Sequence, residues 1–556
     1  MIDETPANHE HFIEDYPERP WLLAGLGGLA GLVVHLLLDV DSEEAWRYAL
    51  ASCAFFAFAA ASFVLGPRRP VQSILFSLGL GVVMGGLAWL AVDSGDRVAG
   101  EEFAFAAGVF FSLLAVPLFQ AGFHRRLWAT PYEETHFHVW TDAVTAGGAL
   151  LFVLLSWLLL WLLDALFGLI GIGFIGDMIE AIGFVGLFCG ATFGAAMGVL
   201  RNQLGIIGTL QRVVMLVFAL LAVPFAFAIM IFLFALLASG GTALWEATDD
   251  ATPVLLACAL GCFVLANVVV RDNDEARSNN VVMIAAALVL CAAIFPLTVF
   301  AAISMGIRID QHGLSPERLW ALVAIVIACA YGLAYWVGLA RGRLAGWSRY
   351  LRRANLHLAV ASCVIALLLA LPLVDFGAIS ARQQVARLQA GEVSVEDFDF
   401  SALRWNFGDA GRDVLRRLAQ REGQVGNLAA TALAREVRYP VSVGRPHENY
   451  ELAFDFDDAE ARQWVRAHVA ANPWLCNGKC VVIDLGTEGN RRRLALVSAG
   501  RVETIGFRDD GVPDPPPAPP EMPPRDAELS PDDVEVREWT GRQIYVDGRP
   551  VGNPFP

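Results

Sequence analysis

The sequence is nearly without lysine and poor in charge of either sign. Lys479 is the only lysine in 556 residues, and charged residues make up 17% of the chain. The formal net charge is −17, and no basic stripe is present that would neutralise the phosphates of a nucleic acid. Hydrophobic residues account for 56% of the chain, which is too many for an ordinary soluble protein. The composition therefore argues against a nucleic-acid partner and predicts a polytopic membrane protein whose main contact is the lipid bilayer.

Sequence motifs of familiar catalytic chemistry are also missing. The chain has no G-x-S-x-G, no H-E-x-x-H, no Walker-type glycine loop and no G-x-G-x-x-G placed after a strand. None of its long apolar runs carries a central Asp or Glu of the kind that proton-coupled transporters use. An enzyme is therefore the least supported class, and the sequence indicates no cofactor.

Long apolar runs dominate residues 21–376. Each is about 20 residues long, enough to cross a hydrocarbon core of roughly 30 Å as a helix. Residues 1–20 are acidic and lack the basic segment that begins a cleaved signal peptide, so we expect the first run to be retained as a span. The predicted spans are 21–38, 45–65, 71–92, 103–119, 143–170, 181–200, 213–238, 253–270, 281–305, 319–340 and 356–376.

Arginines in the short connections predict the orientation of these spans. Thirteen arginines lie in the even-numbered connections and three in the odd-numbered ones. Because basic residues near span ends are retained in the cytoplasm, we expect the N-terminus to be cytoplasmic. Eleven spans then place the C-terminal domain outside the cytoplasm, in the periplasm if the cell has two membranes.

Small residues recur at intervals of four in several predicted spans. This spacing lets helix backbones approach closely and favours a compact bundle over a special dimer interface. The examples are Gly27 with Gly31, Gly81 with Gly85, and the series Gly190, Gly194 and Gly198.

The remainder of the chain has the composition of a soluble domain. Residues 378–434 have a helical pattern with Gly391, Gly408 and Gly423 as stops, and 457–471 form a further amphipathic helix. CVVIDL, RRLALVS and RVETIGF then alternate as short strands, which predicts an antiparallel meander. The predicted fold is thus an all-α transmembrane bundle of about eleven helices, N-terminus inside, followed by a small soluble α+β domain. The predicted parts are a cytoplasmic tail (1–20), the bundle (21–376), a periplasmic α+β domain (377–510), a proline-rich linker (511–524) and a terminal strand pair (525–556).

Two segments resemble the signatures of a bacterial inner-membrane family of unknown function. RIDQHGLSPERLW, at 308–320, resembles the R-I-x-Q-Y-G-L-T-P-E-R signature, with His312 in place of the usual Tyr. DFGAISARQQVARLQAG, at 375–391, resembles the D-P-x-x-x-S-x-x-S-Q-x-x-R-L segment. The resemblance implies a multi-span bacterial protein and brings no activity with it.

The first signature lies in a predicted outward loop, in which Ser315 is placed to cap a helix that begins at Pro316. Its polar residues either fix the loop against the bundle through ion pairs or bind a ligand or partner. The candidates are Arg308, Asp310, His312, Glu317 and Arg318.

Two pairs of residues suggest more specific chemistry. Cys476 and Cys480 flank an Asn-Gly turn in the predicted periplasmic domain, where an oxidising compartment favours a structural disulfide over a metal site or a redox pair. The remaining seven cysteines lie in spans and are expected to pack as small apolar side chains. His136 and His138, with Glu133, Glu134 and Asp142 nearby, are weak candidates for a metal site, and the alternative is a solvated helix or loop at the membrane surface.

The sequence leaves two functional hypotheses from different classes. The first is a non-enzymatic envelope component of the inner membrane that senses or anchors through its periplasmic domain, with a periplasmic or membrane protein as a possible partner. The second is a transporter or channel for a small solute, which the span count and the proline-containing spans suggest.

Overall fold

The computed structural model describes residues 16–38, 44–240, 251–275, 277–435, 451–471, 475–476, 479–488, 491–498, 501–508, 542–546 and 549–555. The chain divides into two compact units, Met1–Arg438 and Tyr439–Pro556. The predicted boundary at 376/377 thus falls inside the first unit, and the predicted 377–510 domain is divided between the two.

Within these described residues, eleven helical segments are long and apolar enough to cross a membrane. They are α1 (Arg19–Leu38), α2 (Ala45–Val64), α3 (Pro70–Ser94), α4 (Glu101–Gln120), α6 (Tyr132–Gly168), α8 (Phe184–Asn202), α9 (Leu204–Ala238), α11 (Thr252–Val270), α12 (Val281–His312) and the two halves of α13 (Pro316–Ala370). Every predicted span is confirmed. Several helices are longer than the apolar runs because polar turns continue the helix beyond the hydrocarbon-length segment, most clearly at the start of α6.

The two halves of α13 are separate spans, Pro316–Arg343 and Gly346–Ala370. Arg343, the last residue of the first span, has φ of 49° and ψ of −151°, and non-glycine residues seldom adopt a positive φ. The chain therefore reverses direction here over very few residues.

Glycine stripes bring α1 and α8 into close contact. A Cβ atom added at Gly27 would overlap the carbonyl oxygen of Gly190, and one added at Gly190 would overlap the carbonyl oxygen of Gly27. Gly31 and Gly186 face one another in the same way. Gly81 on α3 likewise lies against α2, where an added Cβ would come 2.7 Å from the carbonyl oxygen of Cys53. The small-residue spacing in the sequence thus marks helix contacts inside the bundle.

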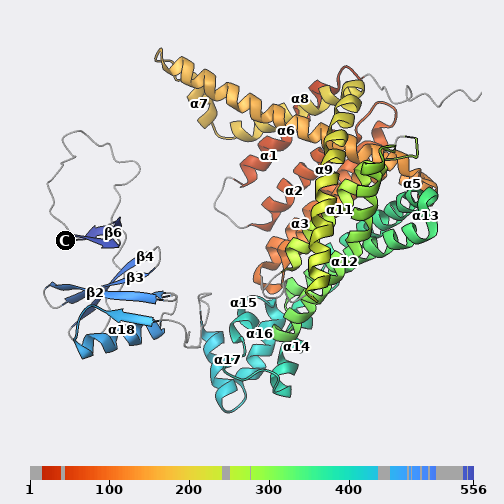
Figure 1. The fold of residues 1–556 in the computed structure, drawn as a ribbon. Helices are drawn as coiled ribbons and strands as arrows, with labels where there is room; N and C mark the ends of the chain where they lie inside the picture. The colour runs from red at the N-terminus through yellow and green to blue at the C-terminus, as the bar shows by residue number, and fades with distance from the viewer. Residues whose placement is uncertain are drawn as a thin grey trace, which may run out of the picture. The chain divides into compact units, whose positions relative to one another are not determined.

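The largest apolar core is formed by α9, α11, α12 and α13, which lie side by side in Figure 1. Its fully buried side chains include Leu290, Leu297 and Tyr335. Large apolar side chains on the outer faces of α6 and α9, among them Leu158 and Phe227, are exposed, as expected for surfaces that face lipid.

Four further helices belong to the first unit: α14 (Phe376–Ala390), α15 (Phe400–Trp405), α16 (Gly408–Ala419) and α17 (Gln424–Ala434). They share a core that includes Leu403 and Leu415, and they lie next to the C-terminal end of α12 (Figure 1). Gly391 ends α14 with φ of 74°, as predicted, whereas Gly408 and Gly423 lie where α16 and α17 begin.

The second unit contains a four-stranded sheet in the order β1-β2-β3-β4. Strands β2 (Lys479–Glu488), β3 (Arg491–Ser498) and β4 (Arg501–Arg508) form the predicted antiparallel meander. Strand β1 (Glu451–Phe454), which the sequence did not predict, pairs in parallel with β2, and α18 (Ala459–Ala471) connects the two. Strands β5 (Arg542–Val546) and β6 (Arg549–Phe555) form the predicted terminal pair as a separate sheet. The predicted linker at 511–524 lies outside the described residues, and so do residues 547–548 between β5 and β6.

Candidate functional site

The first signature segment forms the end of α12, a short loop and the start of α13. Arg308, Asp310 and His312 lie in the last turns of α12, and Gly313 ends the helix with φ of 73°. The Ser315 hydroxyl accepts a hydrogen bond from the Arg318 amide at 3.3 Å, which confirms the predicted cap of α13. The Arg318 guanidinium donates to the carbonyl oxygen of Gly313 at 2.6 Å.

The second signature segment contacts the first directly. Gln384 Nε2 donates to the carbonyl oxygens of His312 and Leu314 at 2.8 and 2.9 Å, and Gln383 Oε1 accepts from the Leu314 amide at 2.9 Å. Arg387 Nη2 donates to the Asp310 carbonyl oxygen at 2.8 Å and to the Gln311 carbonyl oxygen at 3.1 Å. We call this contact between residues 310–314 and the side chains of Gln383, Gln384 and Arg387 the signature interface.

The signature interface explains why glutamine and arginine occupy these positions. The last carbonyl groups of a helix have no partner within it, and long donors from a neighbouring helix can satisfy them. Gln384 and Arg387 are residues of α14 that match the second signature, and both serve this purpose at the end of α12. Asp310, His312 and Glu317 are exposed residues beside this interface.

A polar cleft of about 310 Å³ lies beside the signature interface within the first unit. Glu101 and Glu102 contribute from the first turn of α4, Glu317 from the start of α13, and Trp405 and Asn406 from the end of α15. Carboxylates from two separate helices give the cleft negative charge, which favours cations over anions. Of the five candidate residues in the first signature, Glu317 is the one that lines the cleft.

A buried ring of hydrogen bonds occupies the interior near the arginine-bearing connections. Asn267 Nδ2 donates to the Tyr335 hydroxyl at 2.7 Å, this hydroxyl donates to Asn355 Oδ1 at 3.0 Å, and Asn355 Nδ2 donates to Asn267 Oδ1 at 2.7 Å. Asn355 Nδ2 also donates to the hydroxyl of Tyr132 at 3.2 Å. Asn267, Tyr335 and Asn355 are 7%, 0% and 6% exposed. The sequence reasoning missed this ring because it considered only ionisable residues inside spans.

The connection between α11 and α12 extends this polar region. Ser348 donates to Asp274 Oδ1 at 2.8 Å, and the Arg352 guanidinium forms an ion pair with the same carboxylate. These two interactions, the Ser348 hydrogen bond first, hold the pKa of Asp274 below its usual value. Asn273 Nδ2 donates to Glu133 Oε1 at 3.3 Å, so three arginine-bearing connections meet here.

The two candidate metal-binding histidines have different surroundings. His136 is 6% exposed and packs between Tyr132 and Trp140, with ring centroids 5.6 and 6.3 Å away. The His138 ring lies 5.6 Å from that of Phe137. Nearby, Glu134 pairs with an arginine of the preceding connection. Across the part of the chain that the structure describes, no group of three or more His, Cys, Asp or Glu side chains is arranged to hold a metal ion. A metal site at this pair stays a prediction from the sequence alone.

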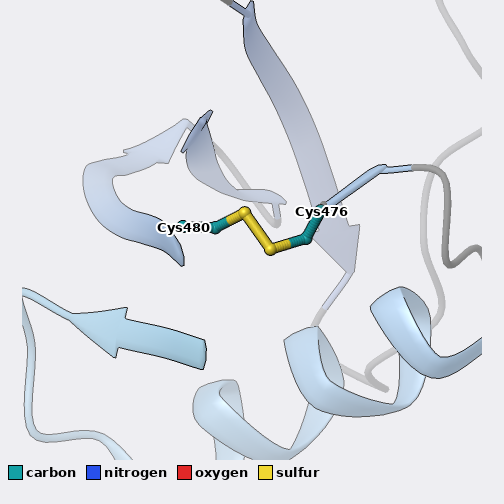
Figure 2. Close-up of a disulfide and its surroundings, with 2 residues drawn as sticks. All are labelled: Cys476 and Cys480. Atoms are coloured by element: carbon teal, nitrogen blue, oxygen red, sulfur yellow. A yellow bond between two sulfur atoms is a disulfide. The ribbon is translucent and has the colours of Figure 1, made fainter. Parts of the chain in front are cut away.

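Cys476 and Cys480 form a disulfide, as Figure 2 shows. Their Cα atoms are 6.0 Å apart, and each residue is 1% exposed. Cys480 lies on β2, and both cysteines belong to the buried apolar core of the second unit, which also includes Val465 and Val469 of α18. The predicted disulfide is therefore confirmed, and it is part of the core of the second unit.

These observations define the class of the protein: it is an integral, multi-pass α-helical membrane protein with a folded extramembrane part. The sequence profile of a family described as "Domain of unknown function (DUF4153)" matches residues 48–418, more than half of the chain, and the chain belongs to that family. The match covers both signature segments and ends within α16. No curated protein and no solved structure matches the chain.

Proposed function

We propose that this chain is a non-enzymatic component of a bacterial inner membrane, in which the extramembrane part senses or binds and the bundle anchors it and transmits its state. The signature interface is the observation that carries the proposal. Through it, α14 attaches to the α12–α13 loop by hydrogen bonds at five main-chain groups, at Asp310, Gln311, His312 and both peptide groups of Leu314. A ligand or partner that binds α14–α17 would therefore act on the spans through these hydrogen bonds.

The distribution of arginine supports a cytoplasmic N-terminus and a periplasmic C-terminal part. The connections that carry most arginines contact one another at one end of the bundle. Arg201 donates to the carbonyl oxygens of Ser62 and Leu65, and the rings of Trp128 and His357 stack with centroids 5.1 Å apart. The positive-inside rule makes this end cytoplasmic. The signature interface then faces the periplasm, where the disulfide of the second unit has an oxidising environment.

Hydrogen exchange of the full-length protein in lipid nanodiscs tests the mechanical connection. Gln384→Ala removes two hydrogen bonds to the end of α12, and amide exchange in α14 and at 308–314 should increase. Arg382→Ala is the matched control, because Arg382 is an exposed residue of the same helix and its Nε donates to the carbonyl oxygen of Ala378 within that helix. Equal exchange in the two variants would show that the interface does not hold α14 to the bundle.

A truncation tests the sensing or anchoring role itself. A chain that ends at residue 376 keeps every span and lacks α14–α17 and the second unit. We expect it to insert and to behave like a complete deletion when cells are challenged with osmotic shock, detergent and lysozyme. Wild-type resistance in cells with the truncated chain would refute the proposal, and reporter fusions after residue 391 check the orientation independently.

A transporter or channel is the second candidate, and two observations favour it. Pro117, Pro224 and Pro296 lie inside α4, α9 and α12, where they interrupt the helical hydrogen bonds, and the buried ring around Tyr335 provides polar groups between spans. Single cysteines at Asn355 and Trp336, in a chain without its native cysteines, distinguish the two functions. Labelling of the Asn355 position by a membrane-impermeant reagent would support a water-filled path, whereas a dry interior supports the anchor.

A further inference from the structure

A carboxyl group and an amide group meet where α4, α6 and α8 approach the arginine-bearing end of the bundle. Asp142 lies on α6, and Gln120 is the last residue of α4. Gln120 Nε2 donates to Asp142 Oδ1 at 3.2 Å and to the carbonyl oxygen of Phe63 at 3.0 Å. The amide nitrogen of Gln120 thus uses both of its hydrogens.

The other two oxygen atoms of this pair are Asp142 Oδ2 and Gln120 Oε1, and both are buried. Neither accepts a hydrogen bond from any residue that the structure describes. Both atoms are acceptors when the carboxyl group is ionised, so neither can supply the donor that the other lacks. Leaving two buried acceptors without donors is unfavourable, and structures rarely retain such groups without a reason.

A single proton on Asp142 Oδ2 would turn one of these two acceptors into a donor. Donation from Oδ2 to Gln120 Oε1 would then accompany the hydrogen bond that Gln120 Nε2 already donates to Asp142 Oδ1. The result is the cyclic pair that a carboxylic acid and a primary amide form with two antiparallel hydrogen bonds. This pair joins α4 to α6 by two hydrogen bonds in place of one.

The groups around the pair make its proton exchangeable. Arg201 on α8 acts on the Asp142 carboxyl group electrostatically and favours its ionised form, and it also acts on His138, one helical turn before Asp142. Arg201 Nη1 donates to the carbonyl oxygens of Ser62 and Leu65 on α2 and its C-terminal cap. Withdrawal from water disfavours a carboxylate, whereas a guanidinium group favours one. On the α9 side, the Thr141 hydroxyl next to Asp142 donates to Gln211 Oε1 at 3.2 Å, which is a contact between uncharged side chains.

We propose that Asp142 is a proton-binding site of the membrane domain, which closes a cyclic hydrogen-bonded pair with Gln120 when it is protonated and opens that pair when the proton leaves. The proton is exchanged with water at the arginine-bearing end of the bundle, and no other group changes its covalent state. Proton binding thereby strengthens the contact between α4 and α6. The proposal goes beyond an anchoring role, because it makes the bundle itself responsive to pH.

Infrared difference spectroscopy of the full-length protein in nanodiscs tests the site. Between about pH 5 and about pH 9 the wild type should show the loss of a carbonyl band of a buried carboxylic acid, and this band should be absent in Asp142→Asn. Asp177→Asn is the control, because Asp177 is exposed on α7 (Phe174–Glu180) and its substitution should leave the band in place. A band that persists in Asp142→Asn, or no pH-dependent band in the wild type, would overturn the proposal.

Thermal unfolding provides an independent measurement. Because the closed pair holds the proton only in the folded protein, wild-type stability should fall as pH rises. Asn at position 142 keeps both hydrogen bonds of the pair without a titrating group, and the dependence on pH should become smaller in Asp142→Asn. If that variant does not fold, Gln120→Leu serves instead: the acid band should remain and shift to higher frequency, because the acid has lost its amide partner. An unshifted band in Gln120→Leu would show that the cyclic pair does not exist.

Discussion

A single methyl group at the contact between α1 and α8 should measure how closely the two backbones approach. A Cβ at Gly27 would overlap the carbonyl oxygen of Gly190 and lie 2.7 Å from the ring of Phe58, so the helices must separate to accommodate Gly27→Ala. Overpacking of a well-packed interior costs about 1–3 kcal/mol. Alanine also improves helix propensity by about 1 kcal/mol, which opposes this cost.

The matched variant Gly25→Ala separates these two effects. Gly25 lies on the exposed side of α1, and a Cβ there meets no atom within 4 Å. Both substitutions gain the same propensity, so Gly27→Ala should be less stable than Gly25→Ala by about 1–3 kcal/mol. Titration of the purified protein with SDS in mixed micelles, followed by tryptophan fluorescence, measures the difference. Equal stabilities would refute the glycine contact between the two helices.

Three further substitutions test other parts of the structure. Tyr335→Phe leaves two buried asparagines without their shared hydroxyl and should lower the unfolding free energy by about 1–3 kcal/mol. Tyr350→Phe removes the hydroxyl of an exposed side chain and should change the unfolding free energy little. Similar losses in the two variants would contradict the buried ring of hydrogen bonds. Replacement of Cys476 and Cys480 by serine should cost about 2 kcal/mol, because the disulfide closes a loop with a sequence separation of 4, and thiol labelling before and after reduction checks its presence in cells. The pKa of Asp274 is lowered in the folded protein, so its contribution is lost as pH falls below the unfolded value of about 4 and through the lower folded pKa. Asp274→Asn should therefore flatten the loss of melting temperature from about pH 5 to about pH 2, and an unchanged slope would contradict the ion pair.

The spans could be predicted from the sequence because each is a continuous apolar run, and a membrane interior requires such a run to be helical. The same holds for local features that one stretch of chain defines by itself. Examples are the Ser315 cap of α13, the end of α14 at Gly391 and the Cys476–Cys480 disulfide. These features depend on residues close in sequence. Their physical causes are therefore visible without the fold.

Features that depend on distant residues could not be predicted. The ring of Asn267, Tyr335 and Asn355 consists of uncharged residues from three spans, and none is conspicuous in its own apolar run. Strand β1 is four residues long and gains its partner only because α18 returns the chain to pair in parallel with β2. The signature interface was partly visible, since both segments were recognised, but one sequence does not indicate that Gln384 reaches the carbonyl groups behind His312.

The two ends of the bundle are joined by α13, and this gives the proposed transmission a physical route. Its first half begins at the Ser315 cap beside the signature interface and carries Tyr335 toward the other end. Its second half carries Arg352 and Asn355 and returns to the turn before α14. Helices are stiff along their axes. A displacement of α14 is therefore transmitted to Asn355 along the second half of α13, and a displacement of the α12–α13 loop is transmitted to Tyr335 along the first half. The hydroxyl of Tyr335 donates to Asn355, and a shift of one half against the other must therefore lengthen or break that hydrogen bond.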